Sequence, residues 1–224
     1  MRTLYLWFLL AFAIMAYGFS PDLYGGFGPL APVDIVHGAL AVSWMALLVV
    51  QSWLIGHGHW RLHGRFGRAS RYLTPLLVGS ALLVVRQMLR VPSGLSRSLV
   101  LTLAWADLVS LVIFSTLYIC AIVYRRRMVL HARFMACTVF VVLPPALARA
   151  YGPLFHGLRA SLQPAYLTVD AAMGALILWD AAHRRFPVPV PLTLAAILFI
   201  QTTAGHAPDW PAFVALARLL GLPG

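Results

Sequence analysis

The stretch "HGALAVSWMALLVVQSWLIGHGHWRLHGRFGR", residues 37–68, decides the fold because a largely apolar run passes directly into a basic one. About 20 apolar residues in a helix cross the roughly 30 Å hydrocarbon core of a bilayer, and residues 37–56 have that length. Residues 57–68 add three histidines and three arginines. Arginines in short loops stay on the cytoplasmic side of a membrane. The stretch therefore predicts a membrane helix followed by a cytoplasmic turn.

The composition of the whole chain agrees with a membrane protein. Of its 224 residues, 61% are hydrophobic and 10% are charged, whereas about a quarter are charged in a soluble domain. The formal net charge is +11, but the basic residues form short clusters between apolar runs instead of one soluble face. We therefore expect the lipid bilayer as a partner and do not expect nucleic acid.

All seventeen basic residues are arginine and all six acidic residues are aspartate. A chain without lysine cannot form a retinal or pyridoxal-phosphate Schiff base and cannot complete a P-loop. A chain without glutamate has no HExxH metalloprotease motif. These absences exclude several enzyme classes, and whether the protein is an enzyme stays open.

Seven apolar runs predict an all-α, polytopic membrane helix bundle. The first follows Arg2 as a signal peptide would, but it lacks a small-x-small cleavage site and is interpreted as a retained helix. Residues 209–221 have apolar residues at helical spacing and predict an interfacial helix. Without repeats or linkers, residues 1–224 are interpreted as one membrane domain. The predicted spans are 3–19, 34–55, 70–89, 98–124, 133–151, 163–182 and 190–206.

The arginines divide unevenly between the two sides of this bundle. Eleven fall beside the amino terminus and the alternate loops on its side, and six fall on the other side. The positive-inside rule then predicts an amino terminus in the cytoplasm and a carboxyl terminus outside. The expected location is a bacterial cytoplasmic (inner) membrane.

Ionisable side chains inside the predicted spans form one candidate site. His37, Asp107, Arg149 and Asp170 lie at similar depths below the outer surface when depth is counted at about 1.5 Å per helical residue. Intramembrane charges usually mark a binding site or a proton path, although such groups also serve as interhelical contacts. We expect these four side chains to form a ligand or proton pocket. Additional members are Arg86 and Gln87 at its rim and Gln51, which shares a helix face with His37.

The eight histidines give a second candidate. A b-type haem bound by two histidines needs neutral imidazoles from different elements at the same depth. His63 and His131 meet this condition at the inner ends of two predicted spans, and we expect them as haem or metal ligands. Three alternatives stay open: an outer haem pair of His37 with His156 or His206, a metal site of His57, His59 and His63, or histidines that only contact solvent and lipid headgroups.

Four segments of the chain resemble a family of uncharacterised bacterial multi-helix membrane proteins. The likeness covers about residues 34–185. One histidine near each of several helix ends also gives a distant similarity to diheme b-type membrane cytochromes, and that similarity implies haem b as a cofactor. The segments are "HGALAVSWMALLVVQSWLIG" (37–56), "LHGRFGR" (62–68), "RRRMVLHARFMACTVFVVLPPALAR" (125–149) and "VDAAMGALILWDAAHRR" (169–185).

Three functions fit these features. The first is a redox-associated membrane protein that binds haem through His63 and His131, or the polar head of a quinone-like lipid near His37. The second is a proton-coupled carrier of a small molecule, in which His37, Asp107 and Asp170 titrate and Arg149 is the counter-charge. The third is an accessory subunit that packs against a larger membrane complex.

Overall fold

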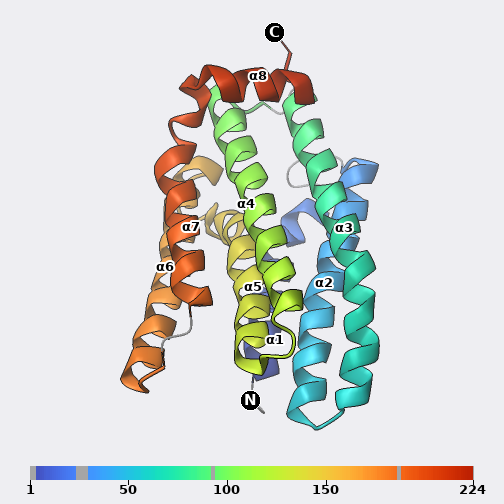
Figure 1. Cartoon of the computed structure of the whole chain (residues 1–224). Coiled ribbons are helices and arrows are strands. Elements are labelled where there is room, and N and C mark those ends of the chain that lie inside the picture. Colours follow the sequence, from blue (N-terminus) through green and yellow to red (C-terminus); the bar gives the residue numbers. More distant parts are fainter. Residues whose placement is uncertain (1–3, 24–29, 92–93, 186–187, 224) are drawn as a thin grey trace.

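The computed structural model describes residues 4–23, 30–91, 94–185 and 188–223, and all regular structure in these ranges is helical. The prediction of an all-α chain is confirmed. Eight α-helices and one short 3-10 helix follow one another along the described chain (Figure 1). They are α1 (Leu4–Leu23), α2 (Pro32–Gly56), α3 (Trp60–Arg90), α4 (Arg97–Val123), α5 (Met128–Tyr151), α6 (Leu158–Ala182), α7 (Pro189–Ala204), η1 (Ala207–Asp209) and α8 (Pro211–Leu220).

Five of the described helices, α2 to α6, are long and apolar enough to cross a membrane. The apolar stretches of α1 and α7 are shorter, at Tyr5–Ser20 and Pro189–Ala204. Large apolar side chains point outward from the bundle, including Val112 at 66% exposure and Leu178 at 72%. Such surfaces fit contact with the acyl chains of a lipid bilayer and place the protein among multi-pass membrane proteins.

The basic stretch after α2 differs from the expected turn. The turn is confined to residues 57–59, and α3 begins ten residues before its expected start at 70. Gly58 reverses the chain with a φ of +79°, a conformation that glycine adopts without steric cost. The amide of His63 then binds the carbonyl of His59 and starts the helical ladder. Gly64 and Gly67 thus lie inside a helix, because their propensity cost of about 1 kcal/mol each does not outweigh the hydrogen bonds of a long helix.

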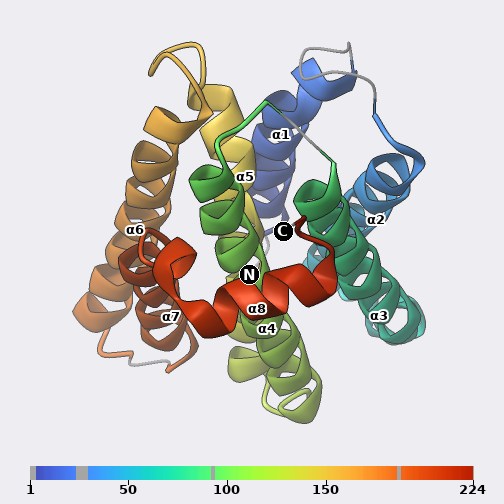
Figure 2. The same ribbon diagram turned by 90° about the horizontal axis from the view of Figure 1, so that it is seen from above.

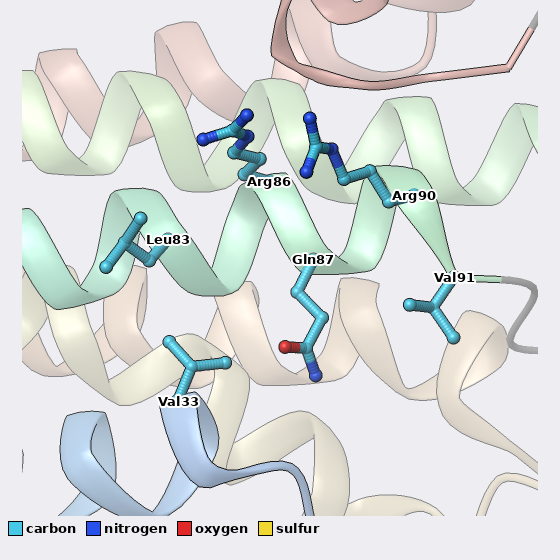
Figure 3. A pocket seen from close by; sticks show the side chains of 6 residues that line it. All are labelled: Val33, Leu83, Arg86, Gln87, Arg90 and Val91. Carbon is cyan, nitrogen blue, oxygen red and sulfur yellow. The ribbon is translucent and has the colours of Figure 1, made fainter.

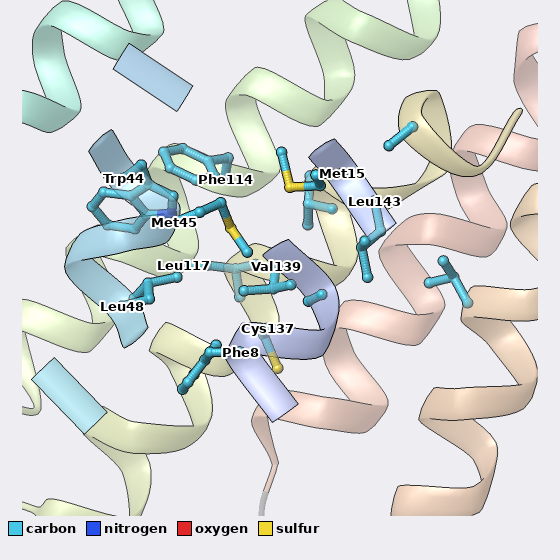
Figure 4. Packing of buried hydrophobic residues seen from close by; sticks show 14 of the residues in the cluster. Phe8, Met15, Trp44, Met45, Leu48, Phe114, Leu117, Cys137, Val139 and Leu143 are labelled. Carbon is cyan, nitrogen blue, oxygen red and sulfur yellow. The ribbon is translucent and has the colours of Figure 1, made fainter. Parts of the chain in front are cut away.

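Helix α5 is the centre of the bundle and packs against α1, α4, α6 and α7. It begins at Met128 instead of 133 and continues through Pro144 and Pro145. Its buried residues join Trp44 and Met45 of α2 and Phe114 of α4 in the main apolar core (Figure 4). A Cβ at Gly18 of α1 would overlap the backbone oxygen of Ala146, so the two helices approach as closely as a glycine allows.

Helix α8 lies across one end of the bundle, over α3, α4 and α7 (Figures 1 and 2). Phe213 and Ala217 of α8 are buried against Val85, Leu89 and Leu101, and they form a second, smaller core. The indole N–H of Trp105 in α4 donates to the Thr203 hydroxyl of α7 at 2.9 Å, close to this core. The predicted C-terminal helix therefore exists, and its apolar face packs on the ends of α3 and α4.

Candidate functional site

The structure brings His63 and His131 together at the end of the bundle opposite α8. Each histidine lies three residues after the first residue of its helix, α3 for His63 and α5 for His131. Their ring centroids are 6.3 Å apart and the ring planes are perpendicular. The two imidazoles that the sequence placed at the same depth are therefore neighbours.

A backbone carbonyl fixes the protonation of His131. Its Nδ1 lies 2.8 Å from the carbonyl oxygen of Ala121 in α4. Ala121 is in the last turn of α4, where carbonyl groups lack a partner within the helix. Because a carbonyl oxygen only accepts, Nδ1 of His131 donates, and in the neutral ring Nε2 keeps its lone pair. Metal-binding histidines are commonly held in this way.

Gln51 of α2 holds the start of α3 beside this pair. Its Nε2 donates to the backbone oxygen of His63 at 3.2 Å. Gly67 lies next to this amide, and a Cβ there would make an ordinary van der Waals contact with Gln51 Nε2 at 3.5 Å. Within the described part of the chain, neither Gln51 Oε1 nor His63 Nδ1 has a hydrogen-bond partner, although both are buried. Two unpartnered polar atoms beside one histidine pair are unusual in a folded interior.

The other two histidines of the basic stretch lie apart from this pair. His57 and His59 stack on the Trp53 ring at centroid distances of 4.4 and 5.7 Å, and Nδ1 of His57 contacts the Trp53 carbonyl oxygen. No group of three or more His, Cys, Asp or Glu residues suited to a metal occurs among the residues that the structure describes. The structure therefore does not support a site of His57, His59 and His63.

An ion pair joins α5 to α6 at the end of the bundle opposite α8. Arg133 NH2 donates to Asp180 Oδ1 at 2.5 Å. Asp180 is 2% exposed, and its second oxygen is buried without a partner in the described structure. Arg133 is one of the eleven arginines predicted on the cytoplasmic side, and its pairing with Asp180 was not predicted. Each is a charged residue near the end of an apolar helix, and that was the available signal.

Three members of the expected pocket gather between α4, α5, α6 and α7. Asp107 interacts electrostatically with Arg149, and the Tyr166 hydroxyl group interacts with both Asp107 and Asp170. The amide of Gln201 donates to Asp170 Oδ2 at 2.8 Å, while Asp170 Oδ1 is buried without a hydrogen-bond partner among the described residues. The sequence did not predict Gln201 as a member of this group.

Arg149 connects this group to α1. Its NH1 donates to the Pro145 backbone oxygen at 3.2 Å, and its guanidinium group lies over the Phe19 ring at 4.6 Å from the centroid. The carbonyl of Pro145 belongs to the last two turns of α5. Arg149 thus holds contacts with α1, α4 and its own helix at once.

His37 has different neighbours from those expected. Its Nδ1 lies 3.0 Å from the Ser80 hydroxyl of α3, and Asp34 is its electrostatic partner on α2. Gln87 of α3 donates to Asp34 Oδ2 at 3.3 Å. His37 therefore belongs to an α2–α3 contact, and the contacts of the described residues do not join it to Asp107.

The rim residues Arg86 and Gln87 line a cavity of about 330 Å³ beside α2 and α3 (Figure 3). Val33, Leu83, Arg90 and Val91 complete its lining. A second cavity, of about 560 Å³, borders His156 in the connection before α6 and Arg159 in the first turn of α6. Both are at the same end of the bundle as α8.

Comparison of the chain with sequence models of known protein families, with curated proteins and with solved structures finds no match.

Proposed function

We propose that the chain crosses a bacterial inner membrane seven times with its amino terminus in the cytoplasm. In this arrangement α1 and α7 join the five long apolar helices as spans. Helix α1 has 20 residues and is about 30 Å long at 1.5 Å per residue, whereas α7 has 16. Local thinning of the bilayer accommodates a short span at modest cost. The excess of arginines beside the amino terminus supports the orientation.

We further propose that His63 and His131 would hold the iron of a b-type haem, each through one imidazole nitrogen. The 6.3 Å separation of the ring centroids carries this proposal. Because metal–imidazole bonds are about 2.0–2.1 Å long, two rings that share one metal would have their centroids roughly 5–6 Å apart, close to the separation of this pair.

The hydrogen bonds around the pair suit this role. The Ala121 carbonyl keeps the His131 ring in one tautomer and orientation, and the buried, unpartnered Nδ1 of His63 offers a lone pair or a proton. Gln51 fixes the backbone that carries His63. Haem supplies one-electron redox chemistry, and the protein would therefore act in membrane-associated electron transfer.

An absorption spectrum of the detergent-purified protein, with metal analysis of the same sample, tests this proposal. We expect a Soret band and about one iron per chain in the wild type. His63→Ala and His131→Ala should each lose the band, while His57→Ala and His59→Ala should keep it because these rings stack on Trp53. No Soret band after haem supplementation overturns the haem assignment, as does copper or iron bound without haem. If a quinone stabilised the wild-type protein and no Soret band appeared, the ligand would be a quinone-like lipid instead.

A second candidate is a proton-coupled carrier, favoured by the group of Asp107, Arg149 and Asp170. Asp107 interacts with the Arg149 guanidinium, and Asp107 and Asp170 both interact with Tyr166. This group of two carboxyl groups and one guanidinium can take up one proton without acquiring a net positive charge. The unpartnered Asp170 Oδ1 is a place for that proton. In liposomes with a pH gradient, Asp107→Asn and Asp170→Asn should slow proton entry measured with a pH-sensitive dye, and the exposed Asp209→Asn should not. Equal rates in all variants would exclude this candidate.

A further inference from the structure

Two arginines mark the outer end of α3, away from the histidine pair. Arg86 and Arg90 are four residues apart and therefore lie on one face of the helix, and both are exposed. Figure 3 shows their side chains leaving α3 in the same direction, while Gln87 points toward Val33 of α2. The arginines and the cavity of about 330 Å³ that they line form what we call the Arg86–Arg90 groove.

Neither Arg86 nor Arg90 forms an ion pair within the described structure. The ion pair identified among the described residues joins Arg133 to Asp180, at the other end of the bundle. Asp34 is the carboxylate beside the groove, and its Oδ2 already accepts hydrogen bonds from the Ala31 amide at 3.1 Å and from Gln87 at 3.3 Å. One carboxylate does not balance two guanidinium groups, so the groove keeps a net positive charge that attracts an anion.

Packing against the C-terminal helix holds one of these arginines in place. The stem of Arg90 crosses the backbone of Gly221, where a Cβ would overlap Arg90 Cγ and Nε. Gly221 ends α8 with a φ of +126°, so the close approach depends on glycine. An arginine stem that is already ordered loses less conformational entropy when it binds a ligand.

The remaining lining of the groove is apolar. Val33, Leu83 and Val91 line it beside the arginines, and Leu83 and Val91 are 53% and 55% exposed. Leu76 lies seven residues before Leu83 on the same face of α3 and is 60% exposed. One helix face therefore presents leucines along the apolar part of the span and two guanidinium groups at its end.

We propose that the Arg86–Arg90 groove binds an anionic phospholipid. The phosphate lies between the two guanidinium groups, which recognise phosphate oxygens through charge-assisted hydrogen bonds. The acyl chain follows Leu83 and Leu76 down the lipid-facing side of α3. A free phosphate ion would satisfy the arginines but would leave the apolar wall without a contact, and this difference favours the lipid.

Thermal unfolding of the full-length, detergent-purified protein tests the groove. Phosphatidylglycerol in mixed micelles should raise the unfolding midpoint, whereas phosphatidylcholine and inorganic phosphate alone should have little effect. At an anionic lipid surface, each basic residue raises the affinity roughly fivefold. The variant R86Q/R90Q should therefore need about 25-fold more phosphatidylglycerol for the same shift. The single variants R86Q and R90Q should need roughly fivefold more each, and they serve if the double variant fails to fold.

The double variant R97Q/R218Q is the matched control. It removes the same charge from two other exposed arginines, at the start of α4 and in the last turn of α8. Its response to phosphatidylglycerol should equal that of the wild type. An unchanged response in R86Q/R90Q, or an equal loss in the control, would overturn the groove as the binding site. An equal shift with inorganic phosphate would overturn the assignment to a lipid.

Discussion

Replacement of Asp180 by alanine is expected to lower the free energy of unfolding by about 2 kcal/mol. The change removes the carboxylate that pairs with Arg133 and leaves the guanidinium group between α5 and α6. The side chain of Asp180 is 3% exposed and that of Arg133 is 21% exposed. The cost therefore depends on how well water can reach the remaining charge.

Two known ranges bracket this value. Removal of one partner from a buried ion pair in a soluble protein costs about 3–5 kcal/mol because a buried charge is left uncompensated. Polar contacts between membrane helices average about 0.6 kcal/mol and reach about 1.7. The partial exposure of Arg133 lets water solvate the unpaired guanidinium, which places the cost below the first range. The loss of a full charge places it above the second average.

Unfolding of the solubilised protein by increasing dodecyl sulfate, followed by circular dichroism, measures this cost. The exposed Asp209 at the other end provides the control, and Asp209→Ala should change stability by less than about 0.5 kcal/mol. The double variant R133M/D180A should lose less than the sum of R133M and D180A, since it leaves no unpaired charge. Additive losses, or equal stabilities for Asp180→Ala and Asp209→Ala, would refute the reasoning from burial.

Three further predictions use the same unfolding assay. Gly18→Ala should destabilise the protein by about 1–3 kcal/mol, because the added Cβ overlaps the Ala146 backbone oxygen and no flexible side chain can yield, whereas Gly79→Ala meets open space and should not destabilise it. Gly221→Ala should cost about 1–3 kcal/mol from backbone strain at φ +126°, and it should raise protease cleavage near α8 as that helix detaches from Arg90. Trp105→Phe removes the hydrogen bond to Thr203 and should cost about 1 kcal/mol; no change would mean that the hydroxyl group readily finds another partner.

The proximity of His63 and His131 could be predicted from the sequence because depth is a one-dimensional property. Both residues lie near the start of a helix, at the end of the bundle opposite α8. Counting along an apolar run gives that position even when the start of the run is misplaced by several residues. The expected start of α3 was ten residues late, yet His63 still falls at the correct end. The tautomer of His131 could not be predicted, since it depends on the Ala121 carbonyl of a different helix.

The neighbours of His37 could not be predicted because they depend on the order of helices around the bundle. Helical periodicity places His37, Trp44 and Gln51 on one face of α2 but does not say which helix that face meets. In the structure α2 packs on α3 and α1, and His37 meets Ser80 of α3. Asp107 of α4 interacts instead with Arg149 of α5 and Tyr166 of α6.

The residue at which α5 begins decides whether Arg133 counts as a cytoplasmic charge. A helix that began at 133 would put Arg133 at its first residue, where it would count as a cytoplasmic charge. Because α5 begins at Met128, Arg133 lies inside the helix, where it forms an ion pair with Asp180. Arg149 lies inside α5 at the opposite end in the same way. Removal of both from the comparison leaves ten arginines against five, and the proposed cytoplasmic amino terminus therefore does not depend on either residue.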